Sequence, residues 1–145
     1  MLPKWHILLG GLFTAIIWFF APETSPIYLT LIFLSSFLID FDHYLNSFIK
    51  NKKLSLPHAL KYYEELNKED ERNYKRGIKK KRNFEIFHTI EFHILIAILG
   101  FLWIAFFYIF IGMVFHSLLD LAWLLYKDRF YRREYFLFSW LREKS

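Results

Sequence analysis

The chain has 145 residues, a length typical of one domain, and it contains no cysteine. The lack of cysteine excludes disulfides, iron–sulfur clusters and thiolate zinc sites, so any metal must be held by His, Asp or Glu. Hydrophobic residues make up 55% of the chain and come in long blocks, which is typical of a membrane protein rather than a soluble domain. In such a protein the net charge of +5 is explained by orientation and by contact with anionic lipid, so no nucleic-acid partner is expected.

The apolar blocks predict one all-α domain, an integral membrane bundle of about four transmembrane helices. No small-residue cleavage site follows the first block, so we interpret it as a retained helix and not as a signal peptide. The run from about Phe84 to Tyr126 has no Lys or Arg and is long enough for two spans, with a turn expected near Phe106–Ile109. Within domain 1–145, the expected parts are spans at 5–20, 27–41, 88–106 and 110–126, a loop at 44–87 and a basic tail at 127–145.

The loop between the second and third spans is strongly basic. Residues 50–82 hold 12 Lys/Arg and 5 Asp/Glu, and apolar residues recur there at roughly helical spacing. Ser55 as N-cap, Pro57 in the first turn and Gly77 at the end predict an amphipathic helix, which lies on the membrane surface or caps the bundle. A solvated charged helix is the alternative. Because the short turns between spans lack Lys and Arg, the loop and both termini are expected on the cytosolic side of the cytoplasmic membrane.

Histidines and acids inside the apolar blocks form the candidate site. A lone charge at such depth costs at least about 2.5 kcal/mol, so several charges must compensate each other, and a metal ion does this well. Folding the two hairpins brings His6 opposite residue 41 and His93 opposite Asp120, while His116 and Asp120 share one helix face. Taken singly, His6 or His88 could be an interfacial anchor, and His93 a core hydrogen-bond partner. Together they predict one metal site at the cytosolic end, with these ligands: His6, Asp40, Asp42, His43, His88, His93, His116 and Asp120.

The ordered motifs resemble those of the membrane-bound metal-dependent hydrolase family, which are inner-membrane proteins. The matching segments are Trp5-His6-Ile-Leu-Leu-Gly10, Leu38-Ile-Asp-Phe-Asp-His43, His88-Thr-Ile-Glu-Phe-His93-Ile94 and His116-Ser-Leu-Leu-Asp120. The chain departs from the family pattern at Ile39, Thr89, Phe92 and Ile94, where the family has Pro, Arg, Thr and Ser. A looser similarity links the His and Asp set to the zinc-dependent phospholipase C and P1 nuclease group. The resemblance implies metal-dependent hydrolysis, with a phosphoester as the expected substrate.

Three interpretations follow from this set of residues. The leading one is a hydrolase of a phosphoester such as a lipid headgroup at the cytosolic face, with Asp42 or Glu91 as the catalytic base or bridging carboxylate. Its cofactor is expected to be Zn²⁺, with Mn²⁺ or Fe²⁺ as alternatives, and eight ligands favour two or more ions. The second is a non-catalytic interaction protein with a structural metal clamp, in contact with the bilayer and anionic lipid. The third is a haem or di-iron protein, because Glu85-Ile-Phe-His88 has the Glu-x-x-His form.

Overall fold

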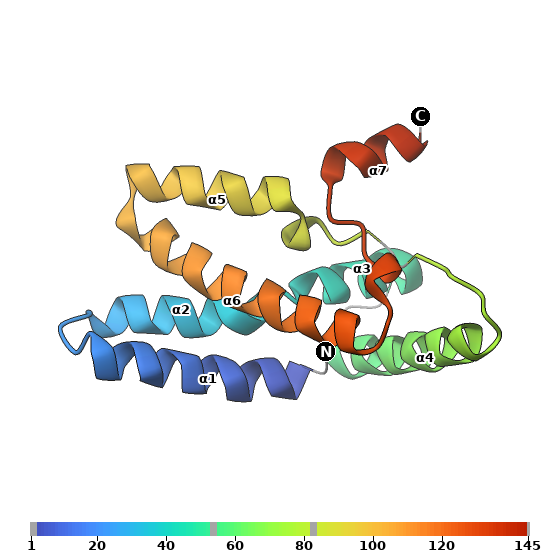
Figure 1. Cartoon of the computed structure of the whole chain (residues 1–145), viewed down its shortest axis with the longest axis horizontal. Helices are drawn as coiled ribbons and strands as arrows, with labels where there is room; N and C mark the ends of the chain where they lie inside the picture. Colours follow the sequence, from blue (N-terminus) through green and yellow to red (C-terminus); the bar gives the residue numbers. More distant parts are fainter. Residues whose placement is uncertain (1–2, 53–54, 82–83, 145) are drawn as a thin grey trace.

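The computed structural model describes residues 3–52, 55–81 and 84–144, and these residues form helices and connecting turns without a strand. The helices are α1 (Pro3–Phe20), α2 (Pro26–Leu38), α3 (Phe41–Asn51), α4 (Leu56–Lys75), α5 (Ile90–Leu102), α6 (Ile104–Tyr126) and α7 (Leu137–Lys144), with short 3₁₀ turns η1 (Ile86–His88) and η2 (Phe130–Arg132). α6 packs against α2 and α5, and α2 packs against α1. Figure 1 shows these four helices running along the long axis, with α3, α4 and α7 gathered at one end. The predicted all-α class is confirmed.

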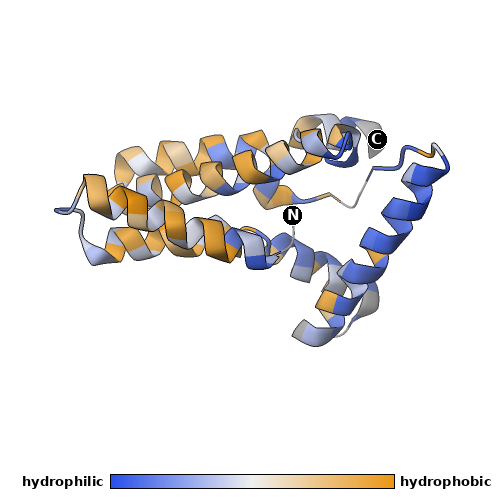
Figure 2. Cartoon of the chain, turned by 60° about the horizontal axis from the view of Figure 1, so that its bottom comes forward, coloured by the Kyte–Doolittle hydropathy of each residue, from blue (hydrophilic) through white to orange (hydrophobic). Residues whose placement is uncertain are grey.

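Three helical segments are long and apolar enough to cross a membrane: Pro3–Phe20, Pro26–Lys50 and Ile104–Tyr126. Large apolar side chains on the bundle point outward, and Phe101 is 91% exposed. Apolar residues continue along the whole length of the bundle in Figure 2. Such a surface is stable in lipid and not in water, so the chain is a membrane protein. α5 is apolar but has only 13 residues, about 20 Å of helix, which is shorter than a full span.

The second predicted span, 27–41, differs from the observed helices in its boundaries. α2 ends at Leu38, a turn follows at Ile39 and Asp40, and α3 continues to Asn51. Residues 44–51, which were expected to begin the loop, are therefore helical. The turn has a physical cause: the polar groups at 40–43 leave the apolar helix and face the middle of the bundle, where their partners lie.

The second hairpin turns earlier than predicted. α5 ends at Leu102, Trp103 is extended, and α6 begins at Ile104, so the expected turn at Phe106–Ile109 is wrong. The helices in the region of the expected spans 88–106 and 110–126 cover 90–102 and 104–126, and of these the second is long enough to span a membrane. Gly100 explains the tight turn, because a Cβ there would lie 3.2–3.3 Å from the backbone of Phe107. The close approach of Gly100 to Phe107 sets the position of this turn. Sequence patterns detect polar turn residues more easily than a contact of this kind.

The basic loop contains the helix that its pattern predicts. α4 follows Ser55 and ends two residues before Gly77, which adopts a φ of +72°. Most of α4 is hydrophilic in Figure 2. Two ion pairs tie it to the segment after α6: Arg129 lies 2.9 Å from Glu71, and Arg132 lies 2.7 Å from Asp70. The helix therefore covers one end of the bundle. Arg82 of the basic run lies outside the described residues.

The membrane topology can be tested with single cysteines, because the natural chain has none. We expect a membrane-impermeant maleimide to label Glu23→Cys and Trp103→Cys from outside the cell, and Lys80→Cys only after the membrane is opened. The physical reason is that both hairpin turns lie at the end of the bundle opposite to α4 (Figure 1). Labelling of Lys80→Cys from outside would reverse the orientation. Protection of Trp103→Cys alone would show that α5 enters the bilayer without crossing it.

Candidate metal centre

Four residues bring one metal-ligand atom each to a common point. They are Asp40, His88, His116 and Asp120, and their donor atoms all lie within 4.8 Å of one another. His116 is 0% exposed and Asp120 is 2% exposed, while Asp40 is partly open. Asp40 comes from the turn between α2 and α3, His88 from η1, and the other two from adjacent turns of α6. The four donor residues therefore come from four separate turns of the backbone.

The position of His116 depends on a very close contact between α6 and α2. A Cβ at Gly112 would collide with the carbonyl oxygen of Ile32 and the hydroxyl of Ser35, so only glycine fits there. One turn later, His116 donates its Nδ1 hydrogen to the backbone carbonyl of Ser36 at 2.8 Å. A carbonyl oxygen can only accept, so this bond leaves Nε2 of His116 without a hydrogen and facing the cluster.

His88 is held in the same way. Its Nδ1 donates to Oδ2 of Asp42 at 3.2 Å, which leaves its Nε2 with a lone pair. The Nε2 atoms of His88 and His116 then face each other at 3.1 Å. Two facing lone pairs repel each other unless a proton or a cation lies between them. Two nitrogens bound to one tetrahedral zinc ion at about 2.0–2.1 Å would be separated by about 3.3 Å, so the observed spacing fits a shared cation.

Two carboxylates complete the set around these nitrogens. Oδ1 of Asp40 lies 3.5 Å from Nε2 of His116, and Oδ2 of Asp120 lies 3.6 Å from the same atom. Burial, together with the nearby charge of Arg133, lowers the pKa of His88. The ring is therefore neutral near pH 7, which is the form that binds a metal. Two imidazoles and two carboxylates are a suitable donor set for Zn²⁺ without sulfur.

Three of the other predicted ligands form a second layer around the four. His6 is fully buried, lies 3.1 Å from Oδ1 of Asp120 and stacks on the ring of His116 at 3.9 Å. His43 lies between Oδ1 of Asp40, at 3.2 Å, and Oε1 of Glu85, at 3.1 Å. Asp42, expected to be a bridging carboxylate or base, accepts hydrogen bonds from His88 and from the backbone nitrogen of Phe87. Such partners fix the orientation and tautomer of ligands.

The remaining two predicted residues are not brought into the cluster. His93 donates from Nδ1 to the carbonyl of Thr89 at 2.8 Å, and its Nε2 lies 3.0 Å from the hydroxyl of Ser117. Glu91, the second candidate base, accepts hydrogen bonds from the backbone nitrogens of Leu137 and Phe138 at the start of α7. The structure thus places Glu91 where it holds the C-terminal helix, away from the four donors.

Two charged residues at the site were not predicted as part of it. Arg133 reaches Oδ2 of Asp120 at 2.7 Å and Oε2 of Glu85 at 3.0 Å. Burial opposes the ionisation of Glu85, but His43 and Arg133 hold its pKa well below the usual range. Ionised Glu85 in turn helps to raise the pKa of Arg133 against the effect of burial. Four carboxylates (Asp40, Asp42, Glu85, Asp120) thus gather around one guanidinium and the ring of His43, and a divalent cation would offset the remaining negative charge.

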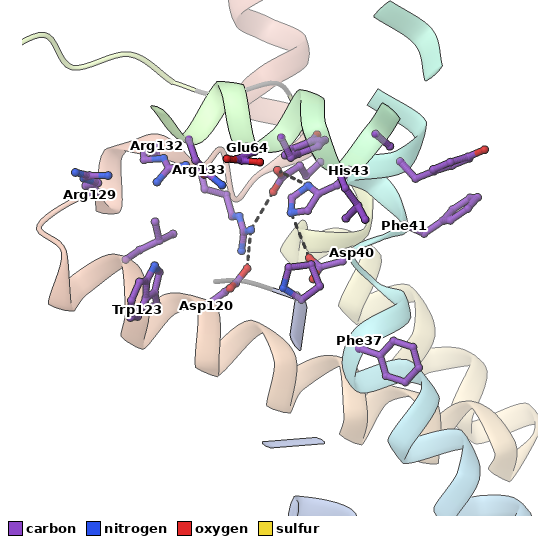
Figure 3. A pocket seen from close by; sticks show the side chains of 18 of the residues that line it. Phe37, Asp40, Phe41, His43, Glu64, Asp120, Trp123, Arg129, Arg132 and Arg133 are labelled. Carbon is purple, nitrogen blue, oxygen red and sulfur yellow. Dashed lines mark hydrogen bonds and ion pairs between the residues drawn. The ribbon is translucent and has the colours of Figure 1, made fainter. Parts of the chain in front are cut away.

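A cavity of about 800 Å³ opens over the cluster between α6 and the α3–α4 pair. Asp40, His43 and Asp120 line its polar side, and Arg133 points between them in Figure 3. Phe37, Phe41, Leu60 and Trp123 form apolar parts of the other walls, and charged residues of α4 and of the segment after α6, such as Glu64 and Arg132, line the rest. A volume of this size can hold a small molecule or part of a lipid next to the donor atoms.

No family model matches the chain, and neither a curated protein nor a solved structure matches it. The resemblance to membrane hydrolases therefore rests on the motif residues themselves. Of these, His88, His116, Asp40 and Asp120 supply the four donors, and His6, Asp42 and His43 surround them.

Proposed function

We propose that the chain is a metal-dependent hydrolase that cleaves a phosphoester of a membrane lipid at the cytosolic face of the cytoplasmic membrane. The observation that carries the proposal is the pair of imidazole nitrogens facing each other at 3.1 Å, with two carboxylates beside them, at the wall of a partly apolar cavity. The order of motifs resembling the membrane hydrolase family supports the same conclusion.

The proposal is one Zn²⁺ held by Asp40, His88, His116 and Asp120, with Mn²⁺ and Fe²⁺ as the alternatives. Four protein donors would fill a tetrahedral ion, so water or substrate would enter as a fifth ligand. A bound divalent ion would supply Lewis-acid activation of water and of a phosphoryl oxygen. The protein residues position that chemistry. Asp42 keeps the lone pair of His88 directed at the site, and His6 does the same for the carboxylate of Asp120.

The cavity residues define how a phosphoester would be held. Arg133 offers a planar fork of donors to phosphate oxygens, next to Asp120. His43 lines the cavity with a carboxylate against each ring nitrogen, which favours its protonated form, so it is placed to give a proton to the leaving group. The apolar walls would take the first part of an acyl chain. In this proposal Asp42 orients a ligand, and His43 acts as the general acid.

The experiment is metal analysis and hydrolysis with the full chain in lipid nanodiscs. We expect about one equivalent of metal per chain and release of phosphate from lysophosphatidic acid, lost on chelation and restored by Zn²⁺ or Mn²⁺. Leu60→Asn, in the apolar wall, should raise KM for this substrate about tenfold by removing apolar contact. Ile49→Asn is the matched control, because Ile49 is also exposed but lies outside the cavity wall, and it should leave KM unchanged.

A structural clamp is the second candidate function, and one observation favours it. The cluster and its surrounding layer join α1, the α2–α3 turn, η1 and α6 through buried contacts. A wild-type protein with stoichiometric metal that cleaves no phosphomonoester, phosphodiester or phospholipid would support the clamp and contradict the hydrolase. Absence of metal would contradict both.

A further inference from the structure

A second, smaller cavity lies on the other side of the cluster, between α5 and α6. It has a volume of about 350 Å³. Its walls are mainly apolar, and the exposed side chains of Ile90, Ile94 and Leu118 border it, so it opens toward the lipid. Three polar side chains that the metal centre does not use also line it: His93, Ser117 and Tyr135.

The contact between Ser117 and His93 has the geometry of a nucleophile and its base. His93 donates from Nδ1 to the carbonyl of Thr89, so its Nε2 carries a lone pair. The hydroxyl of Ser117, 3.0 Å away, must therefore donate its hydrogen to that lone pair. A hydroxyl, a base that accepts its hydrogen, and a third group that fixes the base are the three parts of an activated nucleophile.

Ser117 differs in this respect from other hydroxyl residues of the bundle. The hydroxyls of Thr14, Thr30 and Ser35 donate to carbonyls of their own helix, three or four residues back. That is the usual way to satisfy a hydroxyl in an apolar helix. Ser117 instead bonds across to another helix, and to a side chain inside a cavity.

Tyr135 adds a donor to the same cavity. Its hydroxyl is buried and has no hydrogen-bond partner among the described residues. Its backbone is fixed, because its carbonyl accepts a hydrogen bond from the nitrogen of Ile90 at the start of α5. A buried hydroxyl without a partner is costly, and a ligand oxygen in the cavity would satisfy it.

We propose that Ser117, His93 and Tyr135 form a second, metal-independent site that cleaves a carboxylic ester of a membrane lipid. Nε2 of His93 takes the proton from Ser117 as its oxygen bonds to the ester carbonyl carbon, and the hydroxyl of Tyr135 donates to the carbonyl oxygen. The bond from that carbon to the alcohol oxygen then breaks, and His93 returns the proton to the departing alcohol. Water attacks the acyl-serine with the same proton transfers, which releases the fatty acid and restores Ser117.

The test uses an alkyl fluorophosphonate, which reacts covalently with activated serines, on the full chain in nanodiscs containing chelator. We expect labelling of wild type, located at Ser117 by mass spectrometry, and none of Ser117→Ala. His93→Gln should slow labelling about 100-fold or more, because general-base catalysis contributes about 10²–10⁴-fold. Tyr135→Phe should slow the release of fatty acid from phosphatidylcholine about 100-fold, the effect of losing one oxyanion donor.

The control is Thr14→Val, which removes a hydroxyl bonded within α1 and should label at the wild-type rate. A folded wild-type protein that takes up no probe would overturn the proposal, and so would labelling that is equal in wild type and His93→Gln. Should Ser117→Ala fail to fold, the mass-spectrometric location of the label on wild type decides. Since chelator is present throughout, loss of phosphoesterase activity at the metal centre would not change these results.

Discussion

Replacing His116 with alanine is expected to remove the bound metal and to lower stability in the same protein. The change deletes one of the four donors, which should weaken metal affinity by more than the 10–100-fold typical of losing an outer partner. It also leaves a void beside the stacked ring of His6 in a fully buried place, at a cost on the order of 3 kcal/mol. Elemental analysis and the thermal midpoint in nanodiscs, each with and without chelator, measure the two effects.

The matched control is His93→Ala, which removes a histidine of the same motif set that lies outside the four donors. It should keep the full metal content. Chelation should lower the thermal midpoint of wild type and of His93→Ala but not that of His116→Ala, because only a chain that binds the ion gains stability from it. Equal metal content in His116→Ala and wild type would show that His116 is not a ligand. A wild-type protein without metal would leave a proton between the facing nitrogens and would disprove the metal centre.

The donor pair on α6 could be predicted from sequence because the argument for it uses only residues of one helix. His116 and Asp120 are four residues apart in an apolar run, where polar groups are costly without partners. Asp40 followed from a weaker argument, the level at which hairpin folding places each segment, and His88 followed from the ordered motif set. The structure brings these four together. The helix after Ser55 could be predicted for the same reason, since its cap and proline lie at its start and its glycine lies two residues past its end.

The sequence could not predict which polar residues become the four donors and which residues surround them. Asp42 and Asp40 are two residues apart, and only the turn after Leu38 decides that Asp40 joins the four donors while Asp42 holds His88. Arg133 follows the last span by several residues, and it reaches the cluster only because the chain folds back there. His93 was expected opposite Asp120 because the turn was placed too late. In the structure the turn lies at Trp103, and the side chain across from His93 is Ser117.

The second large effect is expected at Gly112, which is neither one of the four donors nor a lining residue of either cavity. Gly112→Ala should destabilise the fold by about 1–3 kcal/mol, because the added Cβ meets backbone atoms of Ile32 that cannot rotate away. The separation of α2 and α6 must then increase. The carbonyl of Ser36, four residues beyond Ile32, would move away from His116, and the imidazole would lose the bond that fixes its tautomer. We therefore expect metal affinity to fall at least about tenfold, measured by competition with a chelator.

Gly11→Ala provides the control, because a Cβ at that position meets only the ring of Phe33, at an ordinary 3.7 Å. Both substitutions replace an apolar-helix glycine with the same residue, and both gain the same helix propensity. A difference in metal affinity between the two variants therefore reports the contact between α2 and α6 and not the general effect of replacing a helical glycine. If Gly112→Ala bound metal as tightly as Gly11→Ala, then the spacing of these two helices would not set the position of His116. The ion would instead be held by Asp40, His88 and Asp120 without that constraint.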